Sequence, residues 1–262
     1  MAVAAALLFV GLYVAAAARL RRRGDRWSGW AQASFLAGGA AVILVAVVPL
    51  PGGMFTEHMA VHLVTGMAAP LLLVLGRPVT LALRALPPGP PRNSLVALAH
   101  SRAVGVLVFP PVAAVVDVGG LWLLYRTPVF ASMHHDVVLS VAVHLHVFAA
   151  GVLFSFAICQ VDPVRRRYGI GLHAVTLLLA GAAHAILAKS LYGTEPPDTS
   201  FTLDDLHAGA QLMYYGGDLV EVALAVVLAV QWYTAIERRR RVAARSSQRR
   251  SPEGSAPLSP NR

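Results

Sequence analysis

Glu57-His58-Met59-Ala60-Val61-His62 opens the apolar stretch around which the rest of the chain is organised. The stretch continues from Leu63 to Leu75 and stops at Gly76-Arg77-Pro78. Two histidines four residues apart lie on one face of a helix, one turn from each other. Imidazoles at the mouth of a membrane-length segment are costly unless the protein uses them, and paired imidazoles suit copper, zinc and iron. We therefore interpret this segment as a membrane helix that carries a metal site.

The composition predicts an all-α integral membrane protein. The chain has 262 residues, of which 56% are hydrophobic and only 13% are charged, whereas an ordinary soluble domain is about 25% charged. The mean hydropathy is +0.62. The net charge of +9 lies in short clusters between apolar runs and at the C-terminus. That pattern is typical of cytoplasmic loops, and we predict no nucleic-acid partner.

Seven apolar runs are long enough to cross a bilayer, which takes about 20 residues. They cover approximately residues 1–19, 28–50, 55–76, 104–125, 136–159, 169–192 and 208–235. We expect these runs to form a bundle of seven transmembrane helices within a membrane domain of residues 1–237. The first run resembles a signal peptide in length, but its arginines follow the apolar part and do not precede it, so we expect a retained helix.

The basic residues predict the topology. They follow the first, third and fifth runs: Arg19, Arg21, Arg22, Arg23 and Arg26; Arg77, Arg84, Arg92 and Arg102; Arg165, Arg166 and Arg167. The alternate loops are almost free of Arg and Lys, with Arg126 as the exception. The positive-inside rule then places the N-terminus outside and the C-terminus in the cytoplasm. Residues 238–262 are rich in Arg, Ser and Pro, and we expect a disordered basic cytoplasmic tail near anionic membrane lipid.

With this topology, eight of the ten histidines fall on the outer side or in the outer half of the membrane. The candidate metal ligands among them are His58, His62, His135, His144, His146 and His207. On the fifth run, His144 is turned roughly 160° from His146, so the two cannot face one partner helix. His144 and His62 become partners if the third and fifth helices pack together. The alternative for each histidine is a purely structural hydrogen bond at a helix end or between helices.

Carboxylates accompany these histidines. Asp218 and Glu221 are three residues apart in the seventh run and share a face. Together with Asp136 and His184 they are candidates for orienting imidazoles or carrying protons. Several methionines lie near the outer side, and thioethers favour Cu(I), although core packing is their alternative role. The single cysteine, Cys159, excludes an intrachain disulfide and paired-cysteine metal motifs.

Several of these motifs together resemble the multi-span CtaG family of caa3-type cytochrome c oxidase assembly factors. The resemblance covers about residues 30–235. It rests on Glu57 to His62, Ala69 to Arg84, His144 with Gly151-Val152-Leu153-Phe154 and Asp162-Pro163, Leu191-Tyr192, and Met213 to Asp218. The family's His-x-x-x-His falls on His58 and His62, and its fifth-helix histidine falls on His144. Ser155-Phe156 stands where the family usually has paired aromatics, which is a mild departure.

The resemblance implies a multi-pass protein of the bacterial plasma membrane that helps to mature cytochrome c oxidase, with a proposed copper role. We therefore favour a non-catalytic metallochaperone that binds copper and passes it to an oxidase subunit. Two alternatives use the same histidines: a di-metal oxidase or desaturase-like enzyme, and a haem protein with His62 and His144 as axial ligands. A Soret band would identify the haem protein. The sequence leaves open which metal is bound and in which oxidation state, which oxidase subunit is the client, and whether the carrier is one chain or a homo-oligomer.

Overall fold

The computed structural model describes residues 2–163 and 166–249, and every regular element in those ranges is helical. Met1, Arg165 and the predicted tail from residue 250 lie outside the described residues. The helices are α1 (Ala2–Arg22), α2 (Gly29–Val47), α3 (Met54–His62), the π-helical η1 (Leu63–Ala68), α4 (Ala69–Leu75), α5 (Pro78–Ala85), α6 (Pro90–Ala99), α7 (Arg102–Leu107), α8 (Pro110–Arg126), α9 (Val129–Ser132), α10 (Val137–Cys159), α11 (Ile170–Gly193) and α12 (Leu203–Arg249).

Six candidate spans are long and apolar enough to cross a membrane, among the residues that the structure describes. They are Val3–Arg22, Gly29–Val47, Met54–Ala85, Val137–Cys159, Ile170–Gly193 and Leu203–Arg238. The protein is therefore an all-helical, multi-pass membrane protein, as the composition predicted. Each of the six overlaps one of the seven runs expected from the sequence.

The remaining run, predicted as one span over residues 104–125, is broken into α7 and α8. Phe109 between them has extended backbone, with φ −65° and ψ 119°, and prolines occupy the start of α8. Proline lacks a backbone N–H and disfavours helical backbone at the residue before it, so the helix must restart at Pro110. Helix α8 has 17 residues and is about 26 Å long, slightly less than the hydrocarbon core of a typical bilayer.

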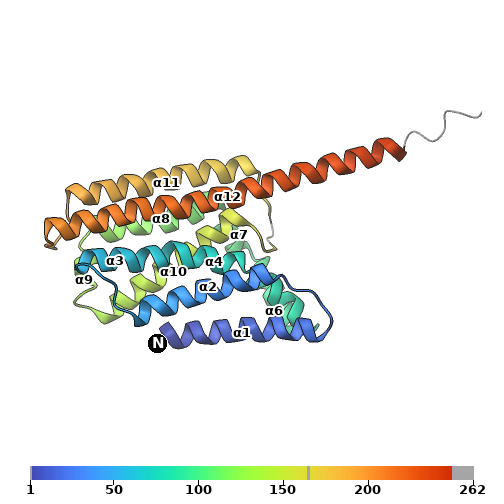
Figure 1. The fold of residues 1–262 in the computed structure, drawn as a ribbon, viewed down its shortest axis with the longest axis horizontal. Helices are drawn as coiled ribbons and strands as arrows, with labels where there is room; N and C mark the ends of the chain where they lie inside the picture. The colour runs from blue at the N-terminus through green and yellow to red at the C-terminus, as the bar shows by residue number, and fades with distance from the viewer. Residues whose placement is uncertain (1, 164–165, 250–262) are drawn as a thin grey trace, which may run out of the picture.

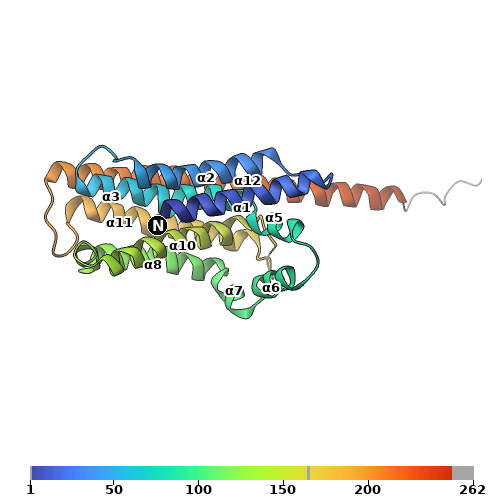
Figure 2. The ribbon, with the colours of Figure 1, turned by 90° about the horizontal axis from the view of Figure 1, so that it is seen from below.

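The long helices lie side by side in one elongated bundle (Figures 1 and 2). Helix α12 packs against α11 and α3, and α10 packs against α8, α4 and η1. Helices α1 and α2 form one flank, with α2 resting on α4. The contact of α10 with η1 and α4 shows that the third and fifth helices pack together, which was the condition for pairing His62 with His144.

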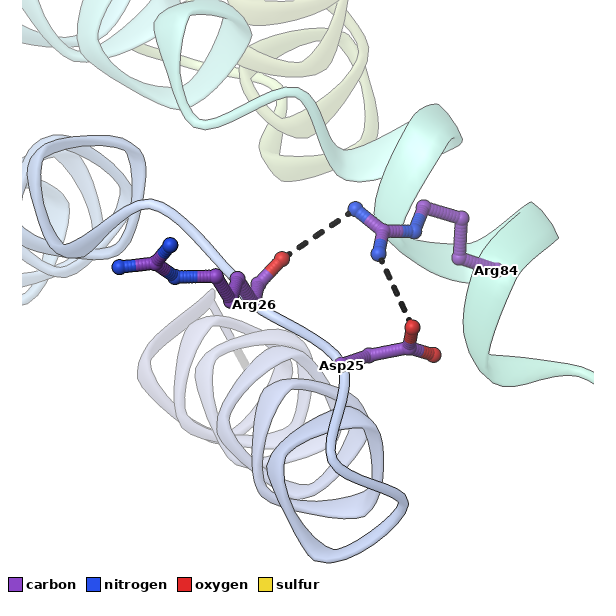
Figure 3. Close-up of polar contacts among 3 residues, drawn as sticks. All are labelled: Asp25, Arg26 and Arg84. Atoms are coloured by element: carbon purple, nitrogen blue, oxygen red, sulfur yellow. Dashed lines mark hydrogen bonds and ion pairs between the residues drawn. The ribbon is translucent and has the colours of Figure 1, made fainter.

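The basic loops meet at one end of this bundle, from which α12 projects (Figures 1 and 2); we call it the basic end. The loop after α1 reaches α5, where Arg84 lies 3.6 Å from the carboxylate of Asp25 and donates a hydrogen bond to the Arg26 carbonyl (Figure 3). The loop after α10 reaches α5 as well, because the buried carboxylate of Asp162 accepts hydrogen bonds from the N–H groups of Val79 and Thr80.

Helix α12 continues to Arg249, past residue 237, where we expected the ordered domain to end and a disordered tail to begin. Six of residues 238–249 are Arg and two are Ala, and both are among the best helix formers. Glu237 and Arg240 also form an ion pair of 3.7 Å one turn apart, which supports the helix locally. Residues 238–249 are therefore helical, which corrects that part of the expectation.

Candidate metal centre at the histidine end

The end of the bundle opposite the basic loops carries most of the histidines, and we call it the histidine end. Helix α3 begins here after Gly53, and its own N-cap residue supplies no side-chain hydrogen bond. Asp205 of α12 replaces it: its carboxylate accepts hydrogen bonds of 2.9 Å from the backbone N–H groups of Phe55 and Thr56 and one of 2.6 Å from the Thr56 hydroxyl. A carboxylate at a helix N-terminus satisfies its free N–H groups and its dipole. Asp205 thus anchors the helix that carries His58 and His62.

The first histidine pair joins α3 to α10. The ring centroids of His58 and His144 are 6.4 Å apart; His58 is half-buried and His144 is exposed. Nδ1 of His144 lies 2.8 Å from the Ser140 carbonyl. A carbonyl only accepts hydrogen bonds, so the proton is on Nδ1 and the Nε2 atom keeps a free lone pair. Nε2 of His58 lies 3.0 Å from the buried hydroxyl of Tyr125.

The second pair joins α3 to α11. His62 lies against His184, with ring centroids 6.4 Å apart and an interplanar angle of 32°. The two residues are only 5% and 2% exposed. None of their four ring nitrogens has a hydrogen-bond partner, although Nδ1 of His184 is 3.4 Å from a carboxylate oxygen of Glu221. Buried polar atoms are nearly always satisfied in folded proteins, so a bound ion or an ordered water molecule is expected beside these four nitrogens.

The predicted pairing of His62 with His144 is therefore wrong: His144 pairs with His58, and His62 pairs with His184. Residues four apart on a helix differ by about 6 Å in height and about 40° in direction. That offset is enough to point one imidazole at α10 and the next at α11. The two histidines of the motif share a helix face but serve different neighbours.

A cavity of about 20 Å³ lies beside the second pair, large enough for one water molecule. Its lining includes His62, His184, Met67, Asp117 and Glu221. Its apolar lining comes from two apolar clusters. The cluster toward the histidine end includes Phe55, Met59, Tyr125, Leu187 and Met213. The cluster toward the basic end includes Leu71, Phe154, Cys159, Leu177 and Leu224.

Three glycines make room for these polar side chains. A Cβ atom on Gly217 would lie 2.2 Å from Cε1 of His184, and one on Gly181 would lie 2.2 Å from Oε2 of Glu221. A Cβ on Gly66 would lie 3.1 Å from the His62 ring. The π-helical turn that contains Gly66 comes just before Pro70. Proline has no N–H for the carbonyl four residues earlier, which favours the wider turn, and such turns are frequent at functional sites.

The other predicted ligands lie elsewhere. His207 stacks on Tyr192, with ring centroids 3.9 Å apart. His146 lies on the opposite side of α10 from His144, where only a glycine, Gly120, fits against its ring. His135 is exposed in the turn before α10. Among the described residues, no group of three or more His, Cys, Asp and Glu side chains is arranged to hold a metal ion.

Of the predicted auxiliary residues, Glu221 and His184 line the cavity, whereas Asp136 and Asp218 do not. Asp136 is the N-cap of α10, where its carboxylate accepts hydrogen bonds from the N–H groups of Val138 and Leu139. Asp218 is half-buried.

Sequence reasoning missed Tyr125 and the capping role of Asp205. Tyr125 is fully buried and contacts the rings of both His58 and His62, at centroid distances of 5.9 Å and 6.3 Å. Its position beside Arg126 at a helix end is typical of an interfacial aromatic, so the sequence carried no signal of burial. Asp205 gave a weak signal, because it follows Asp204 at the start of an apolar helix.

The fold and these contacts define a multi-pass helical membrane protein with two interhelical histidine pairs near one end. A family model described as "Cytochrome c oxidase caa3 assembly factor (Caa3_CtaG)" matches residues 11–235. The chain therefore belongs to the caa3 cytochrome c oxidase assembly factor family, which confirms the resemblance seen in its motifs.

Similar curated proteins come from mycobacteria. The chain is 33% identical over 263 residues to the uncharacterized proteins Mb0105 of Mycobacterium bovis and MT0111 of Mycobacterium tuberculosis, a match that covers 92% of this chain and 39% of each relative. It is 32% identical to the uncharacterized protein ML1998 of Mycobacterium leprae, over 84% of this chain and 37% of that protein. The chain thus spans about two fifths of the length of these relatives. No solved structure is significantly similar to it.

Proposed function

We propose that this chain is a non-catalytic assembly factor that binds copper at the His58–His144 pair and delivers it to a subunit of cytochrome c oxidase. Membership of the oxidase assembly factor family supports the assembly role. The observation that carries the copper role is the pairing of two imidazoles from different helices, 6.4 Å apart, at the accessible histidine end.

The spacing of the two rings suits one bound ion. Two imidazoles on opposite sides of an ion place their ring centroids about 6 Å apart, because a metal–nitrogen bond is about 2.0 Å long. Nε2 of His144 has a free lone pair, and Nδ1 of His58 has one in the tautomer whose Nε2–H donates to Tyr125. Zinc usually takes four protein ligands at a structural site, whereas Cu(I) is soft and is satisfied by few ligands. We therefore favour Cu(I) as the bound ion.

The proposal includes an orientation of the protein in the membrane. The arginine-rich loops gather at the basic end, which the positive-inside rule places in the cytoplasm. The histidine end then faces outward at the plasma membrane, with α8 as a seventh, shorter crossing. Apolar side chains such as Leu8, Phe9, Leu178 and Leu219 are exposed on the helices, as expected for contact with lipid tails, and the basic extension of α12 suits anionic headgroups.

The test uses host cells that lack this protein and are complemented with variants. A His58→Ala/His144→Ala variant should restore neither cytochrome c oxidase activity nor the copper content of the purified oxidase. A His100→Ala variant is the matched control, because His100 is at the basic end and its Nδ1 bonds only to its own helix, at the Val96 carbonyl. Full oxidase activity and copper content with the double variant would exclude copper delivery through this pair.

A further inference from the structure

We infer that His62 and His184 form a second, buried Cu(I) site, so that the two histidines of the His-x-x-x-His motif belong to two different sites. This inference rests on the proposed copper role and deepens it. Their centroid distance of 6.4 Å equals that of the His58–His144 pair. Their four ring nitrogens are buried without any hydrogen-bond partner beside a cavity of about 20 Å³.

The groups around this cavity select the kind of ion. Met67 lines the same cavity as His62 and His184, and a thioether together with imidazoles favours Cu(I) over hard cations. Glu221, whose Oε1 is 3.4 Å from Nδ1 of His184, provides a carboxyl group beside one ligand. Asp117 lines the cavity as well. Ionised carboxylates near a buried cation reduce the free-energy penalty of moving its charge out of water.

The two pairs are connected through one side chain. The Tyr125 hydroxyl is 3.0 Å from Nε2 of His58, and the Tyr125 ring is 6.3 Å from that of His62. The first pair includes the exposed His144, whereas the second is closed between α3, α8, α11 and α12. This arrangement suits an accessible site for exchange with a partner and a buried site for storage of a second ion.

A single water molecule is the alternative occupant of the cavity, and metal stoichiometry separates the two cases. The purified full-length chain is titrated with Cu(I) without oxygen, in competition with a chromophoric Cu(I) chelator. We expect about two bound ions per chain, in keeping with two imidazole pairs. The His184→Gln variant should lose the ion at His62 and His184 and keep the ion at His58 and His144. The His144→Gln variant should lose the ion at His58 and His144 and keep the buried one.

Conservative substitutions at carboxylates test the second site with little risk of misfolding the protein. Glu221→Gln should lower the affinity of the second site about tenfold to hundredfold, as loss of a carboxylate beside a ligating histidine does in other metal sites. Asp218→Asn is its matched control, because Asp218 is three residues away on the same helix and does not line the cavity. Equal weakening by both variants would overturn the buried site.

A second measurement needs no disruptive variant. The X-ray absorption spectrum of the copper-loaded chain should show a sulfur neighbour that Met67→Leu removes, and this exchange conserves side-chain volume. Met213→Leu, in the apolar cluster, should retain it. If wild type binds one ion, lost in His144→Gln but retained in His184→Gln, the buried site is refuted and the proposed function stands. If wild type binds no copper, both proposals fail.

Discussion

Removal of the Asp205 carboxylate tests how the candidate site is positioned. Asp205 of α12 caps the N-terminus of α3 through hydrogen bonds to Phe55 and Thr56, and α3 carries His58 and His62. Loss of an N-cap costs about 1 kcal/mol, and up to about 2 kcal/mol in proteins. Loss of the negative charge at the helix dipole adds about 0.3–1 kcal/mol at a partly exposed position. We expect Asp205→Ala to destabilise the protein by about 2 kcal/mol.

The chain contains its own reporter for this measurement. Cys159 is the only cysteine and is fully buried, so a thiol-reactive fluorogenic dye labels it only when the bundle opens. For a chain of this size, 1 kcal/mol lowers Tm by about 2–4 °C. Asp205→Ala should therefore melt about 4–8 °C below wild type in detergent. Asp205→Asn should fall between the two, because it retains one accepting oxygen.

Asp204→Ala is the matched control. Asp204 precedes Asp205 in the first turn of α12 and is exposed. It therefore reports the loss of a negative charge from that turn without loss of the cap. If Asp205→Ala and Asp204→Ala melt within a degree of each other, the carboxylate does not anchor α3 and the reasoning is refuted.

Three further variants, one of them with a control variant, test other contacts with the same thermal assay. Gly151→Ala should destabilise the protein by about 3 kcal/mol or more, because its Cβ would lie 1.9 Å from a backbone oxygen of η1; Gly171→Ala, in open space on α11, should be neutral or slightly stabilising. Tyr125→Phe should cost about 1 kcal/mol through the lost hydrogen bond to His58, and an unchanged Tm would show that this bond contributes nothing. Arg84→Gln, which removes an exposed ion pair, should cost less than about 1 kcal/mol; a loss above 2 kcal/mol would contradict that.

The sequence predicts the long helices well because apolar runs bounded by charges or turn residues are local features. Residues 136–159 and 169–192, for example, coincide within a residue with α10 and α11. The positions of the basic residues along the chain also predict that the basic loops lie at one end of the bundle. The contacts of Asp162 with Thr80 and of Arg84 with Asp25 show these loops together at that end.

The sequence-based predictions are wrong where tertiary packing, and not the local sequence, determines the structure. A helix break at Pro110 depends on whether neighbours satisfy the freed backbone groups, which hydropathy does not report. The partners of His58 and His62 depend on the rotation of α3 against α10 and α11. That rotation is set by close approaches such as Gly66 to Gly151, and a run of apolar residues does not encode it.

The buried roles of Tyr125 and Asp205 are hidden from the sequence for a related reason. Both residues are at helix ends, where a tyrosine is ordinarily an interfacial anchor and an aspartate ordinarily caps its own helix. In this fold, both residues contact helix α3, which is distant in the sequence. Tyr125 is 67 residues from its partner His58, and Asp205 is 149 residues from Thr56.

The copper content of the purified chain tests the central proposal most directly. Three purified proteins are compared: wild type, the His58→Ala/His144→Ala variant and the His100→Ala variant. Each is loaded with Cu(I) in the absence of oxygen, desalted to remove unbound metal, and analysed for its copper content per chain. The proposal predicts that wild type and His100→Ala bind copper equally and that the double variant loses one equivalent. Equal copper in all three, or none in wild type, would contradict it.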